Sequence, residues 1–485
     1  MTDIRNIARS STLLTRTVAA ALWMGLAVAA CGADLHVDPA GGDDARDGVE
    51  HAVQTISRAI QLAQPGDTIH LQPVVYRDWA AFFDKSGEPG RPIVLDGHGA
   101  TLDGCDPLQP QDWTESEPGL FFNANLMPLT DAIIDRWFFV FDGQLNRMGR
   151  CSKGPSLPLK MPADLQPGEW TFIKDEERTQ TARAGYILGT FWLKLAPAMA
   201  LADARVEVPV RMAGVAMRGN SQHLAVRNLT ATRPYNDGYN LSDCRDVAFE
   251  NIRAIDCGDD GISAHGECLY TVDGFTSIGN ATGICDTGNS QTSYRGVFID
   301  RCLGFDLFFL DTGRYAVSDA HIRSASAKPL YLLGREAPAA SCTVTLNNVW
   351  LERVGDAAEV RVSPGCRLQA SRSTFSHLDW QATGGEINLE QCVVEGNIPL
   401  DPARPPRLHL WPDARWHGDG NRYAWDSIRV GDRAFAANDL AAFREATNSD
   451  RGSLWPAENT PPHPGIGVDR QRLPSAETAA EPARK

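Results

Sequence analysis

The sequence predicts an all-β protein, a right-handed parallel β-helix with a short N-terminal capping helix and a β-rich insertion. One pattern recurs roughly every 22 to 27 residues between residue 223 and about residue 397. Each copy holds a short alternating apolar stretch, a corner of Asn, Asp or Gly, and a second alternating stretch. Helical spacing of apolar residues is almost absent there. Because no copy can bury its own apolar face, neighbouring copies must stack as coils of one solenoid.

The repeat is clearest in four consecutive copies and weaker beyond them. The clear copies span 223–244, 245–268, 269–290 and 291–313, and weaker ones begin near Arg314, Ser341 and Arg367. Outward side chains at the same phase of successive coils line up in a row, at the strand spacing of about 4.8 Å. Residues that recur one coil apart are therefore expected to share one wall.

The N-terminus, residues 1–33, has the features of an export signal. Basic residues precede the apolar run 18–30, which is too short for a comfortable transmembrane helix. The end of that run resembles a bacterial lipobox, which would place a lipid on Cys31, and cleavage after Ala33 is the alternative. In either case we expect a protein exported from a bacterial cell: periplasmic, secreted or lipid-anchored to the outer membrane.

The first coils are expected over 34–104. A strand at its start is followed by a Gly/Asp loop and a short helix over 53–63, whose apolar residues fall at i, i+3, i+4 and i+7. A turn at Pro65–Asp67 then leads into a strand at Thr68–Leu71, and 91–104 reads as further strands. The helix is expected to cap the open end of the core, as repeat folds require.

Residues 105–205 break the repeat and form a predicted β-rich insertion. An insertion of this size in a repeat fold often walls a binding cleft. Trp113, Trp137, Trp170 and Trp192 either offer rings to a ligand there or fill the small core of the insertion. The main helix resumes over 206–400, a closing segment with a short helix follows over 401–473, and 474–485 is expected to be disordered.

Composition limits the partners and the cofactors. The 485 residues carry a net charge of −15, which argues against nucleic acid and disfavours a strongly anionic polysaccharide unless a local basic patch exists. Ten Cys lie beyond the leader without a C-x-x-C pair, which argues against zinc. Export permits disulfides, but small apolar Cys also fill stacked interiors, so both readings stay open.

Three carboxylates stand out in the clear copies. Asp237 lies in an Asn-Asp-Gly corner, and Asp259 and Asp260 lie in an Asp-Asp-Gly corner 22 residues later. One coil apart, they are expected to be neighbours whose repulsion or burial raises at least one pKa. A protonated acid beside an ionised base is what breaking a glycosidic bond requires. The alternative is that these residues are simply corners that tolerate unusual backbone angles.

Other polar residues of the repeat are candidates for the same wall. Strand alternation places Asp259, Ser263 and His265 on one face and Ile262 and Ala264 inside, so His265 either assists the acid or is a solvated corner residue. The predicted substrate-binding residues are Asn236, Tyr239, Asn240, Ser263, Asp286, Arg295, Asp311 and Arg314.

The opening segment resembles secreted right-handed parallel β-helix proteins of the pectin-lyase-like superfamily. The resemblance rests on Pro65-Gly66-Asp67-Thr68, on Val75-Tyr76 without the usual preceding Gly, and on Pro92-Ile93. It covers roughly 34–104 and 206–400. It implies the fold and is weak evidence for a reaction.

A narrower similarity is to the polygalacturonase-like glycoside hydrolases, whose motifs are Asn-x-Asp, Asp-Asp, His-Gly and Arg-x-Lys. Asp259 and Asp260 match the pair, whereas Asn236-Asp237 lacks the intervening residue. Thr282-Gly283 stands where His-Gly is expected, and no Arg-x-Lys follows; Arg295 and Arg314 are the nearest cations. These departures put uronic-acid recognition in doubt.

The sequence therefore favours a polysaccharide-active enzyme, a glycoside hydrolase that uses catalytic Asp237, Asp259, Asp260 and His265 without a cofactor. A lyase or epimerase is the first alternative. It would need a base, and cations or calcium to neutralise a uronate, and the absence of Lys from 223–313 disfavours it. A non-catalytic glycan-binding surface protein is the second alternative. We expect a monomer that binds a polysaccharide, with no transmembrane span.

Overall fold

The computed structural model describes residues 32–127, 129–154, 156–334, 342–354, 359–395, 408–424, 427–436, 439–454 and 465–475. The expected leader, except for its last two residues, and most of the expected C-terminal tail lie outside these ranges. Within them no helix combines the length and the apolar character needed to cross a membrane.

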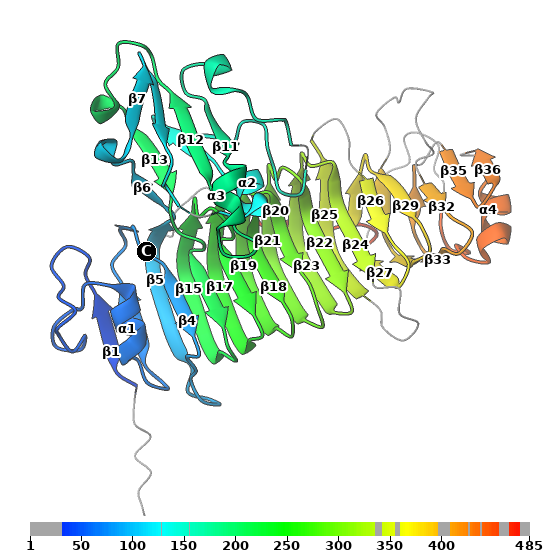
Figure 1. Cartoon of the computed structure of the whole chain (residues 1–485). Helices are drawn as coiled ribbons and strands as arrows, with labels where there is room; N and C mark the ends of the chain where they lie inside the picture. The colour runs from blue at the N-terminus through cyan, green and yellow to red at the C-terminus, as the bar shows by residue number, and fades with distance from the viewer. Residues whose placement is uncertain are drawn as a thin grey trace, which may run out of the picture. The chain divides into compact units, whose positions relative to one another are not determined.

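Two long sheets confirm the predicted parallel β-helix, and Figure 1 shows their strands stacked in chain order. Neighbouring strands are parallel throughout both sheets, except for one antiparallel pair at the C-terminal end of the second sheet. Between residues 222 and 371 the strands of the two sheets alternate along the chain. This connectivity is that of a solenoid in which each turn contributes to both sheets.

The first sheet contains β1 (Asp34–Val37), β2 (Thr68–Leu71), β5 (Ile93–Asp103), β15 (Gln222–Thr232), β17 (Arg245–Ile255), β19 (Leu269–Ile278), β21 (Gln291–Asp300), β23 (Arg314–Ser324), β25 (Cys342–Arg353), β27 (Cys366–Ser371), β30 (Glu386–Glu390) and β33 (Arg415–Asp419), joined by the short strands β3 (Val75–Tyr76), β28 (Thr374–Ser376), β31 (Val393–Glu395) and β34 (Arg422–Tyr423).

The second sheet contains β4 (Ala80–Phe83), β14 (Val215–Arg218), β16 (Tyr239–Ser242), β18 (Asp260–His265), β20 (Thr282–Asp286), β22 (Phe305–Asp311), β24 (Lys328–Gly334), β26 (Glu359–Val362), β29 (Asp379–Ala382), β32 (Leu408–Leu410), β35 (Ser427–Val430) and β36 (Arg433–Ala436).

A further set of Asn, Asp and Gly residues forms bends within the long strands of the first sheet. Asn228, Asn251, Gly274, Gly296 and Asp319 occupy the same place in successive strands and all have positive φ, between 50° and 81°. Asn, Asp and Gly adopt this left-handed backbone at the lowest cost. The side-chain Nδ2 of Asn251 also donates to the side-chain Oδ1 of Asn228 at 3.0 Å, so the bend of one coil is bonded to the bend of the next.

The ends of the solenoid carry the predicted short helices. Helix α1 (Ile56–Leu62) begins at Thr55, whose side chain accepts from the Arg58 amide, and it buries Ile56, Ala59 and Ile60 against β1 and β4. Near the other end, α4 (Leu440–Thr447) buries Phe443 against Trp416 of β33. Both helices are short, so the burial of an apolar face rather than helix propensity holds them in place.

The interior of the coils is apolar and contains most of the cysteines. The ten cysteines beyond the leader are all buried and free. Within the described ranges the alternative of disulfide bridges is therefore not realised, and these thiols pack as small apolar side chains.

A few carboxyl groups are also buried in the coils. Asp306 of β22 is fully buried and accepts from the hydroxyls of Ser324 and Ser326. Burial raises the pKa of Asp306 to about 7 against these two hydrogen bonds. The folded state therefore keeps this proton at pH values where the unfolded chain has already lost it.

Changing Asp306 to Asn is expected to flatten the pH dependence of stability between about pH 4 and pH 7. The native protein binds the proton more tightly than the unfolded chain, so its stability falls as the pH rises through that window, by about 4 kcal/mol at most. Urea unfolding of both proteins at several pH values measures the effect. An unchanged pH slope in the variant would show that Asp306 is not the group responsible.

The insertion forms two small antiparallel sheets of its own. The first contains β6 (Cys105–Pro107), β9 (Phe139–Phe141), β10 (Gln144–Asn146) and β13 (Val206–Pro209), and the second contains β7 (Thr114–Glu117), β8 (Leu120–Asn123), β11 (Trp170–Lys174) and β12 (Gly189–Lys194). Its helices are α2 (Asp131–Arg136) and α3 (Glu176–Gln180). Trp113, Trp137 and Trp170 lie in its core, so of the two readings of these rings the core-filling one holds, while Trp192 is partly exposed.

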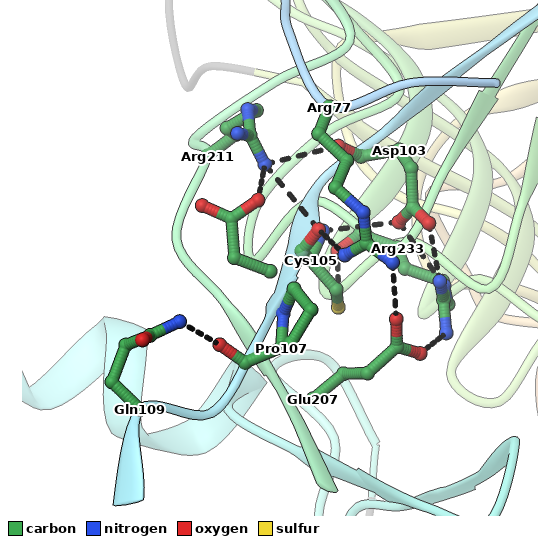
Figure 2. Close-up of polar contacts among 9 residues, drawn as sticks. Arg77, Asp103, Cys105, Pro107, Gln109, Glu207, Arg211 and Arg233 are labelled. Atoms are coloured by element: carbon green, nitrogen blue, oxygen red, sulfur yellow. Dashed lines mark hydrogen bonds and ion pairs between the residues drawn. The ribbon is translucent and has the colours of Figure 1, made fainter. Parts of the chain in front are cut away.

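An ion-pair network fixes the root of the insertion where it leaves and rejoins the coils (Figure 2). Arg233 pairs with both Asp103 and Glu207, and Arg77 donates to Glu207 at 3.0 Å and to the Cys105 carbonyl at 2.9 Å. Arg211 adds a bond of 2.9 Å to the Asp106 carboxylate. Because β13 pairs with β6 here, the insertion extends through residue 209, four residues further than the sequence indicated.

Candidate functional site

The outward face of the second sheet forms a continuous row of side chains. Asn240, Ser263, Cys285, Phe308 and Tyr331 are register partners in β16, β18, β20, β22 and β24. Ile262 and Ala264 alternate with this row and lie in the core, as predicted. Polar residues thus occupy the early coils of the row and aromatic residues the later ones.

The three predicted carboxylates come together at the start of this row. One carboxylate oxygen from each of Asp237, Asp259 and Asp260 lies within 4.8 Å of the others. The Asp260 amide donates to Asp237 at 3.0 Å, while the Asp259 amide donates to the carbonyl of Asn236 at 2.8 Å. Asp237 therefore faces Asp260 rather than Asp259, because the coil here is one residue longer than the 22-residue spacing suggested.

Asp237 is the most constrained member of the Asp cluster, the name we give to Asp237, Asp259 and Asp260. Its carboxylate accepts from the side chains of Asn236 at 3.0 Å, Asn240 and Ser263 at 2.8 Å, besides the amide of Asp260. Four donors fix the orientation of this side chain. Three of the predicted binding residues, Asn236, Asn240 and Ser263, thus hold Asp237 in place.

The insertion covers the Asp cluster with cations. Arg136, at the end of α2, places its Nε 3.0 Å from Asp259. Lys153 places its Nζ 3.3 Å from Asp259 and also contacts Asp260, and the Ser152 hydroxyl donates to Asp259. The three carboxylates are only 1%, 3% and 2% exposed in chain order. The expected open wall is therefore closed in this state.

This environment separates the two adjacent carboxyl groups. For Asp259, burial favours the protonated form, but Lys153 and Arg136 outweigh it and lower the pKa. Burial raises the pKa of Asp260 well above its usual range, and the neighbouring charges of Asp259 and Asp237 add to this effect. Burial opposes the charge of Lys153, yet Asp260 and Asp259 raise its pKa, so it stays protonated. The pKa values of the two neighbours are thus shifted in opposite directions.

The Asp cluster also offers three oxygens to a cation such as calcium. Calcium takes six to eight oxygen ligands. The Lys153 ammonium already contacts two of the three carboxylates, and Arg136 contacts one of these two. These residues fit an internal ammonium counter-ion better than a calcium ion, which would have to displace Lys153.

His265 lies at the edge of the site. Its Nε2 is 3.3 Å from the Ser263 hydroxyl, which in turn donates to Asp237, and its side chain is exposed. The imidazole therefore reaches the Asp cluster only through Ser263. This position suits a supporting residue better than one that touches the reacting atoms.

Three predicted binding residues do not lie on the wall. Tyr239 is fully buried in the core and donates to the Leu229 carbonyl at 2.8 Å. Asp286 points into the coils, where the hydroxyls of Tyr270, Tyr294 and Thr292 donate to it, and burial raises its pKa to about 6. Asp311 lies at a coil corner and accepts from the Gly288 amide at 2.9 Å, so it does not share the phase of Asp286.

The two predicted arginines lie on the other sheet. Arg295 of β21 is exposed and pairs with Asp273 of β19, and Arg314 is the exposed first residue of β23. Register pairs them with residues of the first sheet, not with the row that holds the Asp cluster. Neither residue therefore lies on the wall that holds the Asp cluster, because proximity in sequence to the Asp corners does not fix the sheet.

The cationic partners, which sequence reasoning missed, come from the insertion. Besides Arg136 and Lys153, the buried Arg147 donates to the carbonyls of Cys257 at 2.7 Å and Gly258 at 3.3 Å, directly before Asp259. The insertion lies outside the repeat, so no periodicity signals these contacts. The only available hint was the general tendency of insertions to wall a cleft.

A cavity of about 580 Å³ lies beside this junction, between segment 143–151 and the coil corners. Arg147, Arg233, Arg301 and Asp256 line it together with Cys151. Burial raises the pKa of Asp256, against the charges of Arg147, Arg301 and Arg233. The cavity thus brings several cations to Asp256, which lies three residues before Asp259 in the sequence.

Comparison with known proteins supports the fold. No family model and no curated protein matches the chain. A solved structure described as "Glycoside hydrolase" is 12% identical, with a TM-score of 0.51, and the match covers 92% of this chain and 99% of that one. "The complex structure of XylC with xylose" is 11% identical, with a TM-score of 0.47, covering 84% and 87%, and the pectate lyase Pel9A is 11% identical, with a TM-score of 0.35, covering 82% and 76%. At such low identity the first likeness shows a shared fold, in agreement with the parallel sheets described above.

Proposed function

We propose that the protein is a polysaccharide-active glycoside hydrolase whose chemistry is carried by Asp259 and Asp260. The observation that carries the proposal is the pair of adjacent buried carboxyl groups in contact with Lys153 and Arg136. This environment lowers the pKa of Asp259 and raises that of Asp260. Adjacent carboxyl groups in different protonation states are the acid and base that glycosidic cleavage requires. A solved structure described as "Glycoside hydrolase" shares the fold, which agrees with the proposal.

In this mechanism Asp260 donates its proton to the leaving glycosidic oxygen while Asp259, held ionised by Lys153 and Arg136, attacks the anomeric carbon and the glycosidic bond breaks. A water molecule that Asp260 deprotonates then attacks the same carbon and releases Asp259. The oxygen separations within 4.8 Å are shorter than the roughly 6.5–9.5 Å of inverting carboxyl pairs and closer to the roughly 5–5.5 Å of retaining pairs. The proposal therefore includes a product that retains the anomeric configuration.

A substrate can reach the Asp cluster only if the part of the insertion that contacts it moves; we call this part, Ser152 and Lys153, the cover. Ser152 and Lys153 shield the carboxylates, and the segment that carries them is bounded by Gly149, with φ 68°, and Gly154. Gly reaches backbone conformations that other residues avoid, which suits a segment that changes conformation. A bound glycan would replace Ser152 and Lys153 in their contacts with Asp259 and Asp260. Lys153 would then face the substrate.

Aromatic rings continue the outward row past the Asp cluster. Phe305 stacks on Phe308 with centroids 4.4 Å apart, and Phe308 stacks on Tyr331 at 5.3 Å. Lys328 lies 5.0 Å from the Tyr331 ring centroid. Phe308 is two strand steps from Ser263, about 10 Å along the wall. Rings at this distance offer apolar faces to sugar residues bound beside the cleavage point.

Changing Phe308 or Tyr331 to Ala is expected to raise KM for a long glycan by about tenfold and to leave kcat nearly unchanged, because the rings bind substrate and transition state equally. Steady-state kinetics on long and short oligosaccharides measure this effect. Trp350→Ala, which removes a ring from the other sheet, is the matched control. Equal KM values for all three variants and the wild type would show that Phe308 and Tyr331 do not bind the substrate.

The lyase or epimerase alternative gains one observation from the structure. Lys153 and Arg136 supply the cations that the repeat lacks. These cations could neutralise a uronate. Lys153 is held protonated, however, and a protonated amine cannot accept the substrate proton that elimination removes. The hydrolase therefore remains the better-supported proposal.

A glycan panel digested with the full chain tests the function. A hydrolase releases reducing ends without unsaturated products, whereas a lyase releases both reducing ends and ultraviolet-absorbing unsaturated ends. The anomer first formed, followed by NMR, tests the retaining outcome. Binding of a glycan without cleavage would favour the non-catalytic alternative, which the shielding of the carboxylates also allows.

A further inference from the structure

We propose that His70 and His98 form a binding site for a late first-row divalent cation, such as zinc, on the outer face of the first coils. The Nδ1 of His70 and the Nε2 of His98 lie 2.9 Å apart. One nitrogen of each ring and a carboxylate oxygen of Asp96 lie within 4.8 Å of one another. Imidazole nitrogens are preferred ligands of zinc, nickel and copper. The site is separate from the Asp cluster and does not depend on the proposed function.

The second nitrogen of each ring faces a carboxylate. The Nε2 of His70 lies 2.9 Å from Asp34, and the Nδ1 of His98 lies 3.7 Å from Asp96. Metal-binding histidines usually present their distal N–H to a carboxylate, which fixes the tautomer and orients the ring. If both distal nitrogens carry protons, the two facing nitrogens both offer lone pairs, and a cation between them satisfies both.

The surrounding residues fix these carboxylates and rings. Asp96 accepts from Arg227 at 2.8 Å and from Asn228 at 3.1 Å, so its position is set from a neighbouring coil. His98 has φ 50°, a backbone angle that residues other than Gly rarely adopt, and this places its ring on His70. Two nitrogens that bind one tetrahedral zinc ion lie about 3.4 Å apart. The facing nitrogens share a hydrogen bond in this structure, so a cation would displace the shared proton. The rings would have to separate by about half an ångström and tilt to direct both lone pairs at the cation.

A bound cation would link consecutive coils at the N-terminal end. Asp34 lies in β1, His70 in β2, and Asp96 and His98 in β5, and these strands are neighbours in the first sheet. His98 is partly exposed, so water can complete the coordination. A search of the sequence for C-x-x-C pairs does not detect this site. Its ligands are imidazoles that lie far apart in the sequence and are brought together by strand register.

Isothermal titration of the EDTA-treated full chain with zinc chloride tests the proposal. We expect one saturable site per chain and a rise in Tm on adding zinc. His98→Asn should weaken binding at least tenfold, and Asp34→Asn should weaken it about 10- to 100-fold through the orientation of His70. Circular dichroism and the metal-free Tm establish that each variant is folded.

His223→Asn is the matched control. His223 also has positive φ, 53°, and pairs with the Asp246 carboxylate. Among the residues that the structure describes, no second imidazole is bonded to it. Its affinity for zinc should equal that of the wild type. No saturable binding by the wild type, or equal affinity of the His98→Asn and His223→Asn variants, would overturn the proposal. So would loss of binding in His51→Asn, which would place the site in the exposed group of Asp47, Glu50 and His51.

Discussion

Asp260→Asn is expected to lower kcat on the identified glycan by about 10²- to 10⁴-fold, the range that general acid catalysis contributes. Asn keeps the shape of the side chain but cannot donate a proton to the leaving oxygen. Asp259→Asn is expected to cause a loss of several orders of magnitude as well, because it removes the ionised partner. Steady-state kinetics of both variants measure these losses.

The pH profile of kcat separates the two roles. The raised pKa of Asp260 sets the alkaline limit, since activity falls when the acid ionises, and the lowered pKa of Asp259 sets the acid limit. Asp306→Asn removes a buried carboxyl group with a raised pKa away from the wall, so it should keep full activity. If Asp259→Asn and Asp260→Asn are active but less stable, the Asp cluster is a structural ion-pair network.

Lys153→Met is expected to abolish activity and to lower the free energy of unfolding by about 3–5 kcal/mol, as breaking a buried ion pair usually does. The change leaves Arg136 as the only cation within ion-pair distance of the Asp cluster among the described residues. The pKa of Asp259 should then rise toward that of Asp260, so both carboxyl groups would be protonated and the base would be lost.

The loss of stability should depend on pH in a defined direction. Carboxylates that lack a counter-ion are costly only when ionised, so the deficit of Lys153→Met should be smaller at about pH 5 than at about pH 8. Lys160→Met is the matched control, because Lys160 lies in the same insertion but pairs only with the partly exposed Glu169. Equal denaturation midpoints for the two variants would show that Lys153 does not compensate the buried charge.

The coils were predictable because their determinants are local. Each bend in the first sheet needs a left-handed residue, and the chain supplies one at nearly constant spacing, from Asn228 to Asp319. Alternation placed Ile262 and Ala264 inside. The register was one residue off, because coil lengths of 22 and 23 residues both occur and sequence spacing does not identify which coil is longer.

The site was only partly predictable because it depends on contacts between distant segments. The sequence predicted that Asp237, Asp259 and Asp260 lie together, because Asp237 and the Asp pair are one repeat apart. It misplaced Asp286, whose buried carboxyl group is accommodated by three hydroxyl donors from other strands. It also missed Lys153, because nothing in a non-repeating insertion reveals which part of it contacts the coils.

The long sequence separation between the cover and the Asp cluster has a consequence for folding. Ser152 and Lys153 precede their partners Asp259 and Asp260 by 107 residues. The coils can grow by adding each strand to the one before it, whereas these contacts must close a long loop. During synthesis the insertion is made before the coils that it contacts. Lys153 is therefore present before the acidic wall, and its contacts with Asp259 and Asp260 close only after the coils that carry these carboxylates have been added.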